Sequence, residues 1–431
     1  MSGKSVPLLA KNANFCPQGS GMFRMLSQIV LTNDNETPRR HYRLRWHLFR
    51  YNERINFMLY KSVLKPLFFR FEPEFVHERI TAFGEFLGKF KISRWVVNGL
   101  CHYEHRSLET EICGIKFKNP VGLSAGFDKD VRLTRIIPEV GFGFMEVGAI
   151  TQFPYSGNPG RRLLRLPKDN ALIVYYGLKN IGADAVYKKI QKMIFKIPVG
   201  INIAKTNRDD IKGEDSVKDY VNTYRLLSPY FAYSTINISC PNAQDGCSFQ
   251  DNAELLRKLL SALSCEKKSA PIFLKISNHL SESDIDRILN VVDEYKIING
   301  FIVSNLSKDR ASLNLKSSSD TLDSLPLGGI SGKPIQQKTD RLISYIYQKT
   351  GGKYVIVGVG GIFTAEDAYK KIKAGASLVQ LITGMVYGGP LTIKRINQGL
   401  VNLLKDDGYN SIGEAIGKDL FKADFDKTIV S

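Results

Sequence analysis

The sequence predicts an α/β fold, a (β/α)8 TIM barrel with a small helical extension at its N-terminal end. Beyond residue 110, eight short apolar runs rich in β-branched residues follow one another, and segments of helical period separate most of them. Apolar strands that alternate with helices indicate a parallel sheet covered on its outer face, and eight repeats indicate closure into a barrel. Such a barrel takes about 250 residues. The 431 residues of the chain therefore leave room for an extension.

The first segment, residues 1–45, is strongly basic. Residues 1–70 hold 12 Lys and Arg against three Asp and Glu, an excess of nine within a total formal charge of +18. Asp34 is the first acidic residue, and the Ser, Lys and Arg before it are compatible with a mitochondrial transit peptide. A disordered basic tail fits equally well. The apolar runs of this segment are far shorter than the roughly 18 residues that span a bilayer.

Residues 46–100 predict a small helical domain in front of the barrel. Apolar residues such as Phe75, Val76 and Ile80 recur at helical spacing, and Pro66 and Pro73 should bound two short helices. Aromatic and basic residues mixed on such helices suit a surface in the lipid interface, or a mouth that admits an apolar ligand. Helices that merely cap a barrel explain the pattern equally well.

The eight predicted strands begin near residues 119, 143, 198, 233, 271, 300, 354 and 377, and predicted helices cover 186–197, 252–263, 282–295 and 365–375. Polar residues and glycines gather at the strand ends, where the C-terminal rim of such a barrel carries its ligands. They are Ser124, Ala125, Gly126, Lys129, Gly148, Ala149, Thr151, Asn202, Lys205, Asn237, Cys240, Asn242, Lys275, Ser304, Asn305, Gly358, Gly360, Gly361, Thr383 and Gly384.

Glycine-rich turns follow the seventh and eighth strands. Each turn opens into a helix, so backbone N–H groups and helix N-termini would surround a phosphate. We therefore expect a phosphorylated ligand. Gly358, Gly360 and Gly361 would also permit a tight turn and nothing more, an explanation that is weaker with both loops present.

The cysteines and the charge distribution limit the function classes. Six cysteines are scattered without a CxxC pair, which predicts neither a zinc site nor a disulfide framework and fits a reducing compartment. Cys101, His102 and His105 lie close in sequence, but such residues on a linker are more often surface residues, so no metal is expected. Half of the excess charge lies in the N-terminal arm instead of a barrel rim, which argues against nucleic acid.

A set of motifs resembles the dihydroorotate dehydrogenases in order and approximate spacing. The motifs are NPVGLSAGFDKD, GFGFMEVGAIT, GNPGRRLLRLP, GINIAK, NISCPN, FLKIS, IVSN, GGISGKP, GVGGI, DAYKKIKAGASLVQL and EAIG. The resemblance covers the chain from the mid-fifties to about residue 420. PEFVHERI and the N-terminal helices are similar to the membrane-associated, quinone-dependent class of that family, class 2.

The resemblance implies that residues 101–431 form an FMN-binding barrel that oxidises (S)-dihydroorotate to orotate in pyrimidine biosynthesis, and that 46–100 form a membrane-interface and quinone-entry domain. Carried over by position, the pyrimidine would contact Lys129, Asn237, Asn242 and Asn305. Amides donate and accept, as a ring of alternating C=O and N–H groups requires, and lysine supplies positive charge. FMN would contact Ala125, Gly126, Lys129, Gly148, Ala149, Asn202, Asn237, Lys275, Ser304, Gly332, Gly361, Ile382 and Thr383.

Cys240 occupies the position of the family's catalytic base, which would remove the C5 proton while hydride leaves C6 for the flavin. Class 2 members are expected to carry serine here, and soluble members of the family cysteine. A thiol with a reference pKa of about 8.5 acts as a base near neutral pH far more easily than an alcohol. Ala243 stands where serine-type members have a threonine. A small buried hydrophobe is the alternative role of such a cysteine.

Other positions depart from the family pattern. Val174 replaces a substrate-binding asparagine, Leu178 a usual phenylalanine, and Ile382 a common tyrosine. The loop AQDGCSFQD lacks the usual GLR sequence over the active site. His77 and Arg165 match residues expected near a quinone head group, although His77 would also fit a helix surface. Quinone is therefore the expected electron acceptor.

Two other functions stay open. A related FMN barrel could act on another reduced pyrimidine, even one within RNA, or a non-catalytic paralogue could retain FMN as a binding protein. The leading interpretation places the protein peripherally at the mitochondrial inner membrane, or at the cytoplasmic membrane of a prokaryote, through its N-terminal helices. The sequence makes no prediction of its oligomeric state.

Overall fold

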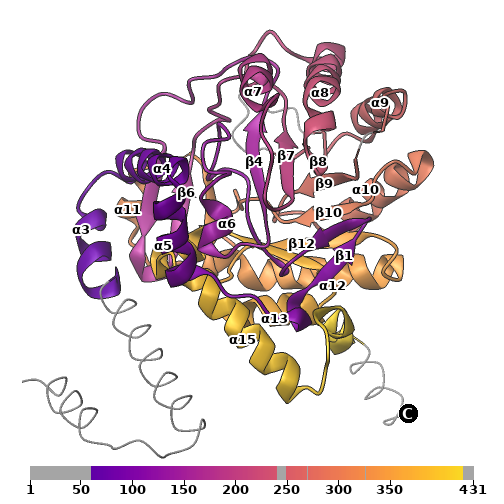
Figure 1. Ribbon diagram of the computed structural model, residues 1–431. Helices are drawn as coiled ribbons and strands as arrows, with labels where there is room; N and C mark the ends of the chain where they lie inside the picture. The colour runs from indigo at the N-terminus through magenta and orange to yellow at the C-terminus, as the bar shows by residue number, and fades with distance from the viewer. Residues whose placement is uncertain (1–59, 240–248, 269, 326, 421–431) are drawn as a thin grey trace, which may run out of the picture. The chain divides into compact units, whose positions relative to one another are not determined.

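The computed structural model describes residues 60–239, 249–268, 270–325 and 327–420. Within the compact unit Phe57–Ser431, eight parallel strands close into a barrel in the order β10-β12-β13-β3-β4-β7-β8-β9. The predicted (β/α)8 fold is confirmed, and all eight predicted strands are present. Figure 1 shows helices arranged around these strands. Their bounds are β3 Val121–Leu123, β4 Phe144–Ile150, β7 Val199–Ile203, β8 Tyr233–Asn237, β9 Ile272–Ile276, β10 Gly300–Val303, β12 Val355–Val359 and β13 Leu378–Leu381.

Helices cover the outside of the barrel, and three of the four predicted ones lie where expected. Ser281 and Thr364 begin α10 and α13 with capping boxes, in which each hydroxyl accepts the N–H of the aspartate three residues on. The main barrel helices are α6 Ile137–Val140, α7 Ala183–Ile190, α8 Gly213–Leu227, α9 Ala253–Ser264, α10 Glu282–Tyr295, α12 Gln336–Thr350, α13 Ala365–Lys373 and α15 Thr392–Asp406.

The helix predicted over 186–197 is only half right. Helix α7 ends at Ile190, and a turn in which the Met193 N–H donates to the Ile190 carbonyl at 2.8 Å follows it. Pro198 lacks an N–H and cannot continue a helix, and Ile194 is 97% exposed, so its apolar side chain never joins the core. The chain uses this stretch to turn back into β7.

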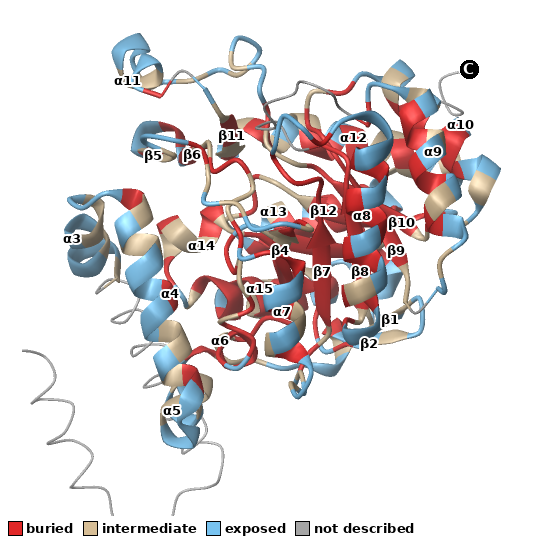
Figure 2. Cartoon of the chain, turned by 90° about the horizontal axis from the view of Figure 1, so that it is seen from above, coloured by how far each residue is buried: buried red, intermediate tan, exposed pale blue. Residues whose placement is uncertain are grey.

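An aromatic layer fills the barrel near the N-terminal ends of its strands. Phe144, Tyr233 and Phe273 pack there with Phe117 of the short hairpin β1 (Thr110–Ile112) and β2 (Ile115–Phe117). Gly200 makes room for this layer, because a Cβ there would lie 2.1 Å from the Tyr233 ring. In Figure 2 the strands form a buried centre inside half-exposed helices. The C-terminal rim is therefore the end available for a ligand.

A second, antiparallel sheet lies beside the barrel and was not predicted. It consists of β5 (Leu163–Leu166), β6 (Ala171–Val174) and β11 (Gly329–Gly332), in the order β11-β6-β5. Its strands are four residues long, and β11 is 155 residues from β6 in sequence, so local periodicity gives little signal. The short helices α11 (Ser319–Asp323) and α14 (Thr383–Gly388) complete this region.

The N-terminal helical segment contains more helix than predicted. A π-helical turn at Tyr60–Leu64 leads into α3 (Lys65–Phe69), α4 (Pro73–Lys89) and α5 (Lys91–Cys101). Pro66 and Pro73 lie in the first turns of α3 and α4, as expected. The backbone becomes extended at Phe90 and starts α5, which the sequence did not reveal. No helix among the described residues is long and apolar enough to cross a bilayer.

Candidate functional site

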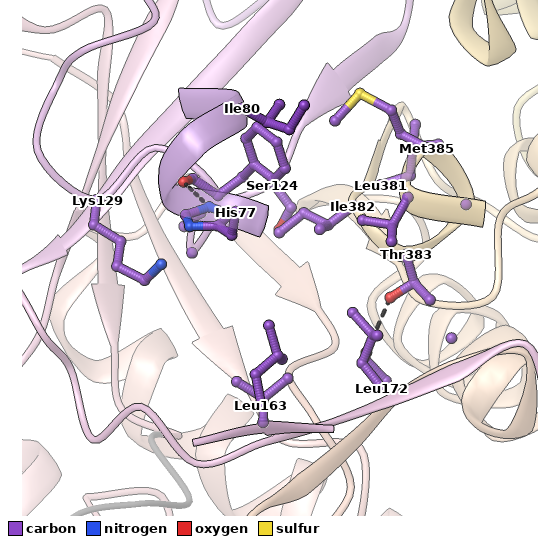
Figure 3. A pocket seen from close by; sticks show the side chains of 18 of the residues that line it. His77, Ile80, Ser124, Lys129, Leu163, Leu172, Leu381, Ile382, Thr383 and Met385 are labelled. Atoms are coloured by element: carbon purple, nitrogen blue, oxygen red, sulfur yellow. Dashed lines mark hydrogen bonds between the residues drawn. The ribbon is translucent and has the colours of Figure 1, made fainter. Parts of the chain in front are cut away.

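A cavity of about 700 Å³ lies between the N-terminal helices and the C-terminal rim of the barrel. Figure 3 shows His77 and Ile80 of α4 on one side of it, and Ile382, Thr383 and Met385 at the other. Helices α3, α4 and α5 all contribute to its wall, together with loops that follow the barrel strands. The helical extension and the barrel therefore share one cavity.

The polar end of the cavity contains most of the predicted rim residues that the structure describes, whereas Thr151, Lys205 and Gly358 do not line it. The lining residues come from loops or ends of all eight barrel strands and from β11 and α14. Cys240 and Asn242 lie outside the described residues. The residues brought together are Ala125, Gly126, Lys129, Gly148, Ala149, Asn202, Asn237, Lys275, Ser304, Asn305, Gly332, Gly361, Ile382 and Thr383.

Ser239 ties two of the predicted amides together. Its hydroxyl donates to Asn237 Oδ1 at 3.0 Å, and its own oxygens accept from Asn305 Nδ2 at 3.1 and 3.2 Å. Asn237 and Asn305 belong to β8 and to the loop after β10, 68 residues apart in sequence, so this link is a product of the fold. Ser239 was missed because a single serine in NISCPN carries no distinguishing signal.

Lys129 lies beside Tyr176 in the wall of the cavity. Its Nζ is 4.1 Å from the centroid of the Tyr176 ring, a cation–π contact. Burial of the ammonium group lowers the pKa of Lys129 to about 8, against the opposing effect of Asp130. Tyr176 follows β6 and was not predicted. An anionic ligand near Lys129 would favour its charged form.

A second unpredicted residue, Glu146, lies behind the cavity lining and reaches the polar end through Asn202. It is fully buried in β4 and accepts a hydrogen bond from Asn202 Nδ2 at 2.7 Å. Its signal in the sequence is a carboxylate within the apolar run GFMEVGAI, where a core strand would carry none.

The site offers features that FMN requires, by two independent observations. Asn202 Oδ1 is buried without a protein partner, so a ligand N–H can satisfy it. At Gly332 and Gly361, φ is +96° and +73°, and a Cβ on either would lie 2.3 Å from protein atoms. These backbone conformations suit glycine alone, and both glycines line the cavity, so the backbone there can approach a ligand closely.

The other arm of the cavity is apolar. One side of its wall consists of side chains from α3 to α5. The other side consists of leucines, isoleucines and Met385 of the barrel. Such a lining accepts a hydrophobic ligand and excludes water. The apolar lining residues include Leu64, Phe68, Val76, Ile80, Phe83, Leu87, Val97, Leu133, Ile136, Leu163, Leu172 and Met385.

His77 and Arg165 both line this cavity, and His77 is not the helix-surface residue that the sequence also allowed. His77 Nε2 lies 2.9 Å from the Phe127 carbonyl, which as an acceptor fixes the proton on Nε2. Burial lowers the pKa of His77 to about 3, so the ring is neutral near neutral pH. Arg165 donates from Nη1 to the Phe71 carbonyl at 2.8 Å and stacks 4.6 Å from the Phe69 ring.

Three carboxylates hold α4 over the barrel. Glu74 receives two hydrogen bonds from Arg162, at 2.6 and 3.0 Å, and one from Lys179 at 3.1 Å. Lys179 also binds Glu78, and Arg132 binds Glu85 on the same helix. A bidentate, partly buried pair of this kind fixes geometry more than an exposed pair does. Helix α4 is thereby positioned as the roof of the cavity.

The positions that depart from the family pattern also line the cavity. Val174, Leu178 and Ile382 all contact it, and Leu178 has φ of +69°. An apolar side chain at Val174 offers no hydrogen bond to a ligand. Among the described residues, no group of three or more His, Cys, Asp or Glu is placed to hold a metal ion.

A closed (β/α)8 barrel with a ligand cavity over the C-terminal rim of its strands defines the class, that of the barrel enzymes. The sequence model described as dihydroorotate dehydrogenase matches residues 107–404. The chain belongs to the dihydroorotate dehydrogenase family.

Named relatives agree with this assignment. A dihydroorotate dehydrogenase (quinone) of Trichodesmium erythraeum is 39% identical over 375 residues, which cover 83% of this chain and 98% of the relative. The protein of the same name from Christiangramia forsetii is 38% identical over 347 residues, 80% and 99% of the two chains. A crystal structure of the enzyme from Eimeria tenella in complex with ferulenol superposes with a TM-score of 0.67 at 28% identity, over 81% of this chain and 96% of that one. The resemblance to the quinone-dependent class is confirmed.

Proposed function

We propose that this protein oxidises dihydroorotate to orotate in pyrimidine biosynthesis, with FMN as hydride acceptor and quinone as oxidant. The observation that carries the proposal is the single cavity with a polar end at the strand ends and an apolar arm under α3 to α5. Family membership supports the same reaction, since the named relatives are quinone-dependent dihydroorotate dehydrogenases.

The pyrimidine is held at the polar end. Lys129 would pair with the substrate carboxylate, and Asn237 and Asn305, joined through Ser239, would read the ring. We assign Asn242 to the same ring on its sequence position alone. Fixing these amides before the substrate arrives lowers the cost of orienting it.

Cys240 is proposed as the base that takes the C5 proton. Its place in NISCPN, three residues after Asn237, supports this role. FMN, when bound, supplies an acceptor for the C6 hydride. We propose that Lys129 and Asn237 hold the FMN together with Ala125, Gly126, Gly148, Ala149, Asn202, Lys275, Ser304, Gly332, Gly361, Ile382 and Thr383.

The quinone is proposed to enter the apolar arm and meet His77 and Arg165. Neutral His77 carries its proton on Nε2 and donates it in a hydrogen bond to the Phe127 carbonyl. Only Nδ1, an acceptor, is then left for a ligand. Arg165 keeps further N–H donors beyond the one that it gives to Phe71. Arg165 would therefore donate to a quinone carbonyl, and His77 would accept from the hydroxyl of the reduced form.

The protein is further proposed to lie on a membrane surface through α4 and α5. Phe83, Phe86, Ile92 and Trp95 expose 58%, 55%, 78% and 77% of their surfaces on these helices, next to the arm that a lipid-soluble quinone would enter. A face of this composition suits insertion at the lipid interface. The curated relatives cited above are bacterial, so they lend no support to the mitochondrial location expected from residues 1–45.

A charge on this face should weaken vesicle binding. For Trp95→Glu we expect binding to anionic phospholipid vesicles to fall roughly 10- to 100-fold, because about 1.5–3 kcal/mol of apolar burial is lost. Co-sedimentation of the protein with the vesicles measures this binding. Ile194→Glu is the matched control, since Ile194 is 97% exposed on the turn after α7, away from α4 and α5 in sequence. Equal binding by both variants and the unmodified protein would refute the membrane surface.

Substrate choice tests the proposed reaction against its alternatives. Quinone reduction should proceed with dihydroorotate and fail with dihydrouracil, which lacks the carboxylate that Lys129 would bind. Preference for dihydrouracil would favour an enzyme of another reduced pyrimidine. A protein that retains FMN but reduces quinone with neither compound would be a non-catalytic paralogue.

A further inference from the structure

Glu146 is the centre of a buried hydrogen-bond cluster inside the barrel. Its Oε1 accepts from Asn202 Nδ2 at 2.7 Å. Its Oε2 lies within reach of Gln380 Nε2 and Thr235 Oγ1, both at 3.2 Å, and of the Tyr233 hydroxyl at 3.4 Å. Three strands, β7, β8 and β13, thus direct donors at one carboxyl group of β4 that is 0% exposed.

This cluster decides which end of the Asn202 amide a ligand meets. A carboxylate accepts hydrogen bonds only, so the NH₂ of Asn202 must face Glu146 and the reversed amide would set two oxygens against each other. The remaining group, Oδ1, is buried and has no protein partner. Since Asn202 lines the cavity, a bound ligand is the available source of the missing donor.

We infer that Glu146 is a positioning residue that fixes Asn202 as a hydrogen-bond acceptor toward the ligand at the floor of the cavity. The identity of that ligand rests on the proposed function. The pyrimidine ring of a flavin carries one N–H between two carbonyl groups, so an acceptor opposite that N–H selects the ring in one orientation. Glu146 acts through Asn202, which lies 56 positions away in the sequence.

The experiment exchanges the carboxyl group of Glu146 with the amide group of Asn202. Glu146→Gln can turn either end of its amide toward Asn202 and should weaken FMN binding roughly tenfold, as expected for one lost hydrogen bond. Asn202→Asp places a second carboxylate against that of Glu146 and should weaken FMN binding at least as much. In the double variant Glu146→Gln/Asn202→Asp, an amide donates to a carboxylate that still offers an acceptor to the ligand, so affinity should return to within about threefold of the original.

FMN affinity of the apoprotein is measured by quenching of flavin fluorescence, with circular dichroism to check the fold. Thr235→Val is the matched control, because it removes one donor to Glu146 and leaves the Asn202 contact intact. We expect the control to bind FMN within about threefold of the original protein. If Glu146→Gln fails to fold, Asn202→Asp compared with the double variant decides the same question.

Two results would overturn the inference while the proposed function stands. In one, the double variant binds FMN more weakly than either single variant. In the other, Thr235→Val is as damaging as Glu146→Gln, which would make the cluster merely structural. An unmodified protein that fails to bind FMN would remove the proposed function itself, and the inference with it.

Discussion

Replacement of Cys240 by alanine should leave FMN bound and slow its reduction by dihydroorotate by roughly 10³-fold, within the 10²–10⁴ that a general base contributes. The loss should fall on the chemical step, because a methyl group cannot accept the C5 proton. Anaerobic stopped-flow mixing, with flavin absorbance as the signal, measures that step without any quinone.

Two further variants place the sulfur in the mechanism. Cys240→Ser should retain intermediate activity with its pH profile moved upward, since a hydroxyl gives up its proton less readily than a thiol. Adding Ala243→Thr to Cys240→Ser should recover part of the rate, if that threonine assists the serine-type base. Reduction of Cys240→Ala at an undiminished rate would remove Cys240 from the reaction.

The affinity for orotate should fall as pH rises through about 8. Burial lowers the pKa of Lys129 from its usual 10.5 to about 8, so the ammonium form is complete below that value and is lost above it. Only the ammonium pairs with the orotate carboxylate. A spectral titration of the FMN-loaded enzyme with orotate should show a loss of up to tenfold per pH unit above the pKa and little change below pH about 7.

Two substitutions of Lys129 complete this test. Lys129→Arg keeps its charge at every pH used and should abolish the pH dependence. Lys129→Met should lower flavin reduction by roughly 10²-fold at all pH values, as expected for loss of one charged donor in an enclosed site. An orotate affinity that stays constant up to pH about 10 in the unmodified protein would contradict the assignment of Lys129 to the carboxylate.

The barrel was predictable because its signals are local. Each strand is a short apolar run followed by polar residues, and Ser281 and Thr364 mark helix starts by capping boxes that can be read from four residues. The rim residues were predictable for the same reason, since the C-terminal ends of parallel strands meet at one edge whatever the packing. The family resemblance added their roles.

The missed features depend on long-range packing. Tyr176 lies beside Lys129 only because the segments after β6 and β3 meet in the fold, and Glu146 meets Asn202 because β4 and β7 pair. The sheet β5-β6-β11 joins segments more than 150 residues apart, and α5 starts where one extended residue, Phe90, interrupts an apolar helical pattern. Side-chain periodicity reports which face is buried, and it carries no information about the partner on the other side.

The claim that one cavity serves both half-reactions is tested most directly by sequential anaerobic mixing of the FMN-loaded protein with dihydroorotate and then with a soluble quinone. The account predicts that the yellow flavin absorbance bleaches on the first addition and returns on the second. Absorbance that dihydroorotate leaves unchanged, while a chemical reductant bleaches it, would contradict the account.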